Sequence, residues 1–132
     1  MEFIKMYLIA FIVFLIIDGI WLVFVAKKFY SKHLGYIMKE KPNLLAAGLF
    51  YLIFIVGLVY FVVKPGVEAQ SIGSVILGGA LLGFVSYATY DLTNMATVEK
   101  WPTIVTVVDL IWGTSLSTVI SVASYLIYNF LF

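Results

Sequence analysis

The sequence contains no cysteine and no arginine, and its only histidine is His33. The absence of cysteine excludes disulfides, thiol nucleophiles and thiolate metal sites. A single histidine also excludes the zinc, di-iron and haem sites that need paired histidines. No phosphate-binding loop and no dinucleotide-binding glycine pattern is present. The sequence therefore predicts no cofactor and no metal centre of these kinds.

Charged residues are scarce as well. They make up 11% of the 132 residues, whereas hydrophobic residues make up 64%; a soluble domain usually has about a quarter of its residues charged. The net charge of +1 comes with no basic stripe, which excludes a nucleic-acid partner. The length fits one domain, residues 1–132, and the composition predicts that its main partner is the lipid bilayer.

Four long apolar runs divide the chain. Residues 3–26 exceed the roughly 20 residues that a membrane-spanning helix needs, and no signal-peptide cleavage site follows them. Pro42 and Pro102 stand where a proline is tolerated, at the first position of a helix. We expect an all-α fold, a polytopic membrane protein with four transmembrane helices in an antiparallel bundle. The expected spans are residues 3–26, 43–63, 71–94 and 102–131, and the second is expected to stop at Lys64-Pro65-Gly66.

The lysines are distributed unevenly between the two sides. Six lie in the loops 27–42 and 95–101, and only Lys5 and Lys64 lie on the opposite side. The positive-inside rule therefore predicts that both loops are cytoplasmic and both termini are outside. The basic stretch 27–41 fits a short interfacial helix between the first two spans. A solvated basic loop with snorkelling lysines fits it equally well.

Three aspartates, Asp18, Asp91 and Asp109, lie inside the apolar runs. At 1.5 Å rise per residue, Asp18 and Asp109 lie about 12 and 10 Å above the cytoplasmic ends of their helices, and Asp91 about 5 to 9 Å. No arginine or lysine inside the spans can neutralise them. The site is therefore expected to hold protons, a cation or a cationic substrate.

Other polar and aromatic residues fall at similar depths. Tyr51 and Tyr87 are each about 12 Å from the cytoplasmic end, while Asn43 and Asn94 lie near the interface. The motif Asp-x-x-Trp occurs twice, ending in Trp21 and in Trp112. Residues three apart share a helix face, so each indole could cover or donate to a carboxyl group.

Structural roles compete with these functional ones. Protonated aspartates can hold helices together by hydrogen bonds to neighbouring polar groups, and Asp91 to Asn94 could simply end a helix. Tyr51, Tyr87 and Tyr90 are typical packing or interface residues. Two small-residue stripes predict close helix packing: Gly79 with Gly83, and Gly113 with Ser117, Ser121 and Ser124.

The chain resembles a family of small bacterial membrane proteins catalogued as domain of unknown function 2177. The resemblance lies in Asp18-x-x-Trp21, Asn43 with Ala46-Ala47, Phe50-Tyr51, the block from Tyr87 to Asn94, and Asp109-x-x-Trp112-Gly113. It implies four transmembrane helices and a membrane location, and we expect this membrane to be the bacterial inner membrane. It implies no activity and no catalytic residues.

Three functions remain open. The first is a carrier or channel for protons, cations or a small cationic or amphipathic solute, with dimerisation to a homodimer expected. Asp18 and Asp109 would bind and take up protons, Asp91 and Asn94 would form a gate, and the lining would comprise Trp21, Asn43, Tyr51, Tyr87, Tyr90 and Trp112. The second is an intramembrane enzyme acting on a lipid or isoprenoid, favoured by a pocket open sideways to lipid. The third is a non-catalytic assembly subunit, favoured by fully paired aspartates and no cavity.

Overall fold

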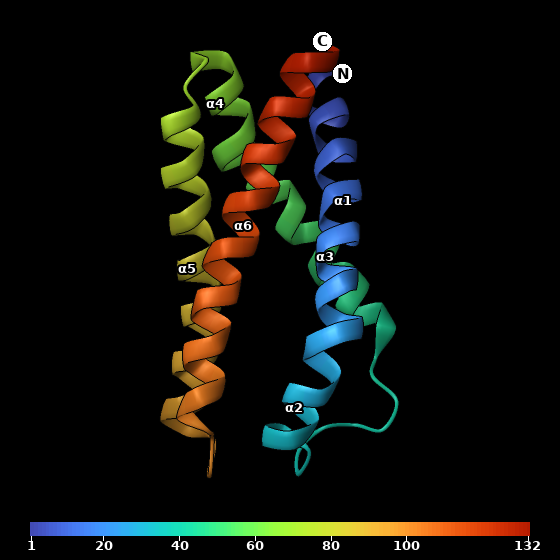
Figure 1. The fold of residues 1–132 in the computed structure, drawn as a ribbon, viewed down its shortest axis with the longest axis vertical. Coiled ribbons are helices and arrows are strands. Elements are labelled where there is room, and N and C mark those ends of the chain that lie inside the picture. Colours follow the sequence, from blue (N-terminus) through green and yellow to red (C-terminus); the bar gives the residue numbers. More distant parts are fainter.

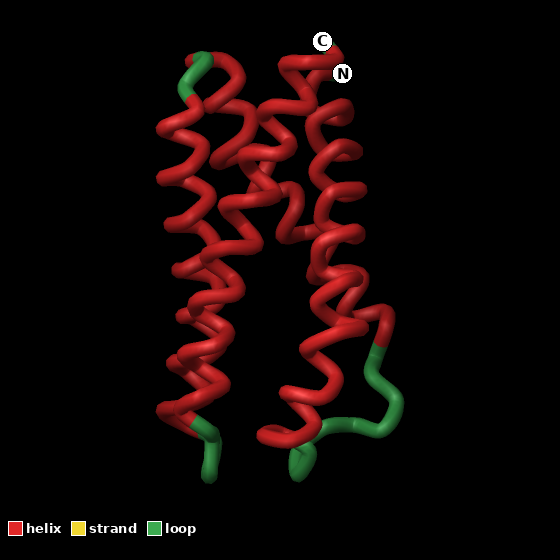
Figure 2. Tube along the Cα trace, in the orientation of Figure 1, coloured by secondary structure: helices red, strands yellow, loops and turns green.

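The computed structural model describes residues 1–132, which form only helices and loops (Figure 2). Four continuous helical segments are long and apolar enough to cross a membrane, which confirms the predicted all-α fold. The first comprises α1 (Glu2–Trp21), a π-helical turn η1 (Leu22–Ala26) and α2 (Lys27–Leu34). The second comprises α3 (Leu44–Leu58), a second π-helical turn η2 (Val59–Val63) and α4 (Lys64–Ala69). The others are α5 (Ile72–Thr97) and α6 (Thr103–Leu131).

The basic stretch after the first span continues the helix as α2 to Leu34. It is neither a separate interfacial helix nor a solvated loop from residue 27 onward, and the loop covers only residues 35–43. Leu34 is buried against Trp101 and Val105 at the beginning of α6. This apolar contact gives one face of α2 a packing partner, while Lys27, Lys28 and Lys32 remain exposed.

The prediction that the second span stops at Lys64-Pro65-Gly66 is wrong, because the helix runs through these residues to Ala69. A proline inside a helix loses one hydrogen bond and clashes with the carbonyl group four residues earlier. Here that earlier residue is Phe61, which belongs to the π-helical turn η2. The wider π turn can relieve the clash, as local π adjustments do in apolar surroundings. The helix ends at Gln70, whose backbone is left-handed (φ 49°).

Side-chain caps set the starts of two helices, α3 and α5. The Asn43 side chain accepts a hydrogen bond of 3.1 Å from the Ala46 N–H, so Asn43 caps α3 and Pro42 lies before the helix. Ser71 caps α5 in the same way through the Ser74 N–H. These caps satisfy backbone donors that a helix leaves free at its beginning.

α5 and α6 pack side by side along their lengths (Figure 1). A Cβ atom added at Gly79 would lie 2.9 Å from Ser121 Oγ, and one added at Gly83 would lie 2.3 Å from the Gly113 carbonyl oxygen. The small residues therefore let the two helices approach almost backbone to backbone. The pair forms one wall of the bundle, against which α1 packs through α6.

The two ends of the bundle differ. Both termini lie at one end (Figure 1), which we call the terminal end, and the loops 35–43 and 98–102 lie at the other, the loop end. Eleven buried residues fill the terminal half, among them Met6, Ile55, Leu58 and Ile120. At the loop end, the Tyr36 hydroxyl donates to the Lys100 carbonyl oxygen at 2.8 Å. This hydrogen bond links the two loops at the loop end of the bundle.

Candidate functional site

Three acids are buried in the half of the bundle nearer the loops. Asp18 on α1 is 7% exposed, Asp91 on α5 is 0% exposed, and Asp109 on α6 is 4% exposed. Asp91 does not end its helix, since α5 continues two turns further to Thr97. The interpretation of Asp91 as a helix exit into water is therefore wrong. All three side chains are held inside the bundle by regular helix.

Asp91 and Asp109 form a carboxyl pair, because their side chains lie next to each other across the α5–α6 contact. The Tyr30 hydroxyl, reaching across from α2, donates a hydrogen bond to Asp109 Oδ1. Neither carboxyl oxygen of Asp91 receives a hydrogen bond from any donor of the protein. Two negative charges this close repel each other unless a proton or a cation lies between them. We call Asp91 and Asp109 the carboxyl pair.

The backbone around the carboxyl pair is fixed from α6. Trp101 Nε1 donates to Thr106 Oγ1 at 3.0 Å, and both residues are buried. The Thr106 hydroxyl in turn lies 3.5 Å from the Asp91 carbonyl oxygen. Gly113, one turn after Asp109, leaves room for the Tyr87 ring, whose Cδ1 would lie 2.1 Å from a Cβ atom at this position. The glycine therefore brings an aromatic ring next to the carboxyl pair.

Asp18 lies in a neighbouring position rather than in the pair itself. Its carboxyl group lies beside the Tyr51 hydroxyl of α3. Tyr87 lies close enough to interact with both Asp18 and Asp109. The structure thus brings Asp91 and Asp109 into contact, and it places Tyr87 near both the pair and Asp18.

Three adjoining cavities surround these acids. One of about 350 Å³ is lined by Phe50, Ser86, Tyr87, Tyr90 and Asp109. A second, of about 400 Å³, is lined by Leu22, Ala26, Lys27, Tyr30, Leu34, Met38, Tyr90 and Asp109. A third, of about 270 Å³, is lined by Asp18, Trp21, Leu22, Tyr30, Ala47, Phe50, Tyr51, Tyr87 and Trp112. Each cavity shares lining residues with the other two, so the three adjoin one another; we call them together the hollow region, and its walls are mostly aromatic and aliphatic.

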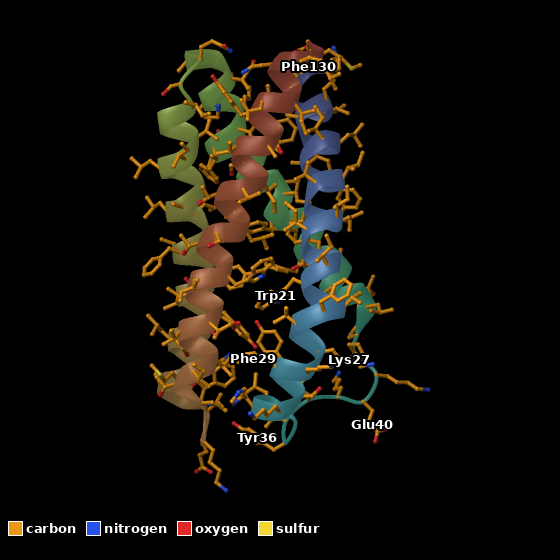
Figure 3. The ribbon with its side chains drawn as sticks, viewed as in Figure 1. Trp21, Lys27, Phe29, Tyr36, Glu40 and Phe130 are labelled. Carbon is orange, nitrogen blue, oxygen red and sulfur yellow. The ribbon has the colours of Figure 1, made fainter.

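The two Asp-x-x-Trp motifs meet in the third cavity. Trp21 and Trp112 stack face to face, with ring centroids 4.1 Å apart and an interplanar angle of 10°. Figure 3 shows Trp21 directed from α1 into the space beside α6. Each motif belongs to one of two antiparallel helices, which explains how indoles from distant parts of the sequence reach the same level. The stacked pair forms one wall of the Asp18 cavity.

The remaining predicted residues take different positions. Tyr90 is 56% exposed and lines two of the cavities at their outer edge. Asn94 is half-buried one turn further on, beside Tyr90. Asn43 is exposed, caps α3 and does not line these cavities. Its role in the structure is to start the helix that carries Tyr51.

Sequence reasoning missed Tyr30, which touches Asp109 directly, because it assigned residues 27–41 to the interface. A signal was available in the four-residue spacing of Leu22, Ala26, Tyr30 and Leu34, which places them on one face of a continued helix. All four line the second cavity. Phe50 and Ser86 were also missed as lining residues, and nothing in their local sequence distinguishes them from lipid-facing neighbours.

No built-in cation neutralises the acids. The only ion pairs in the structure join Lys5 to Glu2 and Lys64 to Glu68, both on the exposed surface. Lys27 lines the rim of the second cavity without an ion pair. No group of three or more acidic, histidine or cysteine side chains is placed to hold a metal ion. The site therefore offers negative charge and aromatic surface to whatever occupies it.

The model of the family described as "Predicted membrane protein (DUF2177)" matches residues 3–126. The chain belongs to this family. No curated protein and no solved structure matches it. The family description states a membrane setting and no reaction, so any function has to be argued from the site.

Proposed function

We propose that this protein is a carrier that exchanges protons for small organic cations, with the carboxyl pair as its binding site. The observation that carries the proposal is the pairing of Asp91 and Asp109 without a countercharge, beside cavities with aromatic walls. Buried acids of this kind in a membrane span are functional candidates by default, because they are costly to keep there.

The cavity walls support an organic cation as the ligand. Tyr30, Tyr87 and Tyr90 surround Asp109, and Phe50 completes the wall from α3. Aromatic faces attract ammonium groups, and the attraction grows where water is excluded. A carboxylate supplies the full charge, while the rings accept the alkyl groups that surround a quaternary nitrogen.

The carboxyl pair also supports exchange with protons. A proton between the two carboxyl groups removes their repulsion, and a bound cation does the same. The two occupants therefore compete for one position, which is the basis of proton-coupled exchange. Other ionisable groups lie near the pair and tune this competition: Lys27, Tyr30, Tyr87 and Tyr90.

A carrier fits the rest of the bundle better than an open channel. The terminal half is filled by the apolar core around Ile55, Leu58 and Ile120, which leaves no continuous path. Passage would need movement of the helices, and π-helical turns are frequent at such points. η1 adjoins the cavities through Leu22 and Ala26. Following the lysine count, we take the loop end as the cytoplasmic side.

The test is uptake of tetraethylammonium into proteoliposomes with an acidic lumen. The native protein should accumulate the cation as protons leave, and binding in detergent should strengthen as the pH rises because protons compete less. Asp109→Asn should abolish uptake and weaken binding at least about 10-fold, because the loss of about 1.4 kcal/mol of binding free energy raises the dissociation constant 10-fold. Glu99→Gln is the matched control, because Glu99 is an exposed acid in the loop. Uptake by Asp109→Asn equal to that of the native protein would refute the proposal.

One observation favours a second candidate, an intramembrane enzyme acting on a lipid or isoprenoid. Phe50 and Tyr90, at the edge of the first cavity, are 50% and 56% exposed on the apolar surface of their helices, so a lipid chain could enter between α3 and α5. The carboxyl pair would then act as general acid and base. Incubation of the protein with bilayer lipids and isoprenyl phosphates, followed by mass spectrometry, separates the candidates. A product that disappears in Asp109→Asn would favour the enzyme.

A further inference from the structure

The hollow region has two acidic positions rather than one. The carboxyl pair lines the first and second cavities through Asp109, and Asp18 lines the third beside Tyr51. The first and third cavities share Tyr87 and Phe50 in their lining. The two acidic positions therefore lie in adjoining cavities, with these two aromatic rings common to both. Asp91 is wholly buried, and neither of its carboxyl oxygens accepts a hydrogen bond from the protein, which leaves both oxygens free for a proton or a positive occupant.

The charges of the two positions can be counted. With one shared proton, the carboxyl pair carries a single negative charge, and Asp18 adds a second whenever it is ionised. Arginine is absent from the sequence, and the one nearby lysine, Lys27, is exposed at the rim. Two separated negative charges without internal countercharges are best matched by two separated positive charges.

We propose that the ligand class is a linear dication, an alkane chain with an ammonium group at each end. One ammonium binds at the carboxyl pair and the other binds at Asp18 with the Tyr51 hydroxyl. The alkyl spacer lies along Tyr87 and Phe50, whose rings suit methylene groups and flank both ammonium ends. This inference rests on the proposed function and specifies its substrate class.

Two acidic positions give a dication an affinity advantage over a monocation. Once one ammonium is bound, the second meets its carboxylate at a high effective concentration, provided that the spacer has the right length. A spacer that is too short leaves Asp18 unpaired, and one that is too long has to fold inside the cavities. The structure thus predicts an optimum in a series of diamines of increasing length.

The experiment is isothermal titration of the detergent-solubilised protein, at one fixed pH, with a series of α,ω-diamines and with alkylamines of matched length. The native protein should bind the best diamine at least about 10-fold more tightly than its matched alkylamine. Asp18→Asn should remove this advantage, so that the best diamine binds no more tightly than its matched alkylamine. Glu40→Gln, an exposed acid in the loop 35–43, is the matched control and should alter neither affinity.

The outcomes separate this inference from the proposed function. Alkylamine binding that depends on Asp109, with no diamine advantage at any length, would overturn the dication and leave the carrier standing. Absence of binding by every amine would refute both. If Asp18→Asn does not fold, the length series on the native protein decides alone, because a flat series contradicts a two-point site.

Discussion

The terminal half and the loop half of this bundle use the same four helices in opposite ways. In the terminal half, α1, α3 and α6 meet in a core of residues such as Met6, Ile55 and Leu58, each at most 2% exposed. In the loop half, residues of all four spanning segments, α5 included, surround three cavities and three buried acids. The difference shows that this protein keeps its buried acids together, at one end of a scaffold that is closely packed at the other.

The α5–α6 pair connects the two halves. Its small residues keep the two backbones in contact, from Gly79 opposite Ser121 to Gly83 opposite Gly113. Where this contact reaches the loop half, Gly113 receives the Tyr87 ring and Asp91 comes to lie beside Asp109. The position of the carboxyl pair therefore depends on helix contacts that begin in the packed half.

The largest expected effect comes from separating α5 and α6. A Cβ atom at Gly83 would lie 2.3 Å from the backbone oxygen of Gly113, which cannot move without shifting the helix. Gly83→Ala should lower the free energy of unfolding by about 3 kcal/mol, at the upper end of overpacking costs. Thermal unfolding in detergent measures this. Gly48→Ala is the control, since nothing lies within 4 Å of a Cβ atom at Gly48; equal stability of the two variants would contradict close α5–α6 packing.

A smaller effect should distinguish the two halves directly. Leu58 is 0% exposed in the terminal half, whereas Phe50, two turns earlier on α3, is 50% exposed at the cavities. Leu58→Ala should cost about 2 kcal/mol, the low end for buried leucines, because lipid lowers the transfer contribution and leaves mainly the cavity cost. Phe50→Ala should cost less than about 1 kcal/mol. Equal losses in a denaturant titration would mean that the halves are equally well packed.

The smallest expected change is a gain in stability at the carboxyl pair. In Asp91→Asn the side-chain amide can donate a hydrogen bond to Asp109, which replaces the repulsion that arises in the native pair whenever it holds no shared proton. The variant should be more stable by about 1 kcal/mol, while its tetraethylammonium affinity falls. Thermal unfolding and binding, measured on the same preparation, test both effects. A loss of stability would instead identify Asp91 as a residue that holds the helices together.

Much of the fold was predictable from local sequence. Long apolar runs predict spans because a helix has to satisfy its own backbone in lipid, and four spans are present. The errors came from Lys27 to Leu34 and from Pro65. In both places a local signal, clustered lysines or a proline, indicated an end that packing of Leu34 and the π turn η2 overrode.

The candidate site was predictable in part. That Asp18, Asp91 and Asp109 lie inside helices follows from the apolar runs around them, but the depth counted for Asp18 took residue 26 as the helix end, and the helix continues to Leu34. The contact between Asp91 and Asp109, and the donor role of Tyr30, do not follow from counting. They depend on how far each helix is rotated about its own axis, and neighbouring helices determine that rotation.

The sequence alone determined that the chain forms apolar helices and that acids occur within them. It also determined that no arginine or lysine near these acids in the spans can neutralise them. Composition and the rise of the helix decide these properties residue by residue. Only the tertiary structure decided which acids form a pair, which acid lies outside that pair near Tyr87, and where the cavities lie. The physical reason is that side chains from different helices meet according to helix rotation and separation. Glycine and serine contacts between α5 and α6 set both of these, at a distance from the acids themselves.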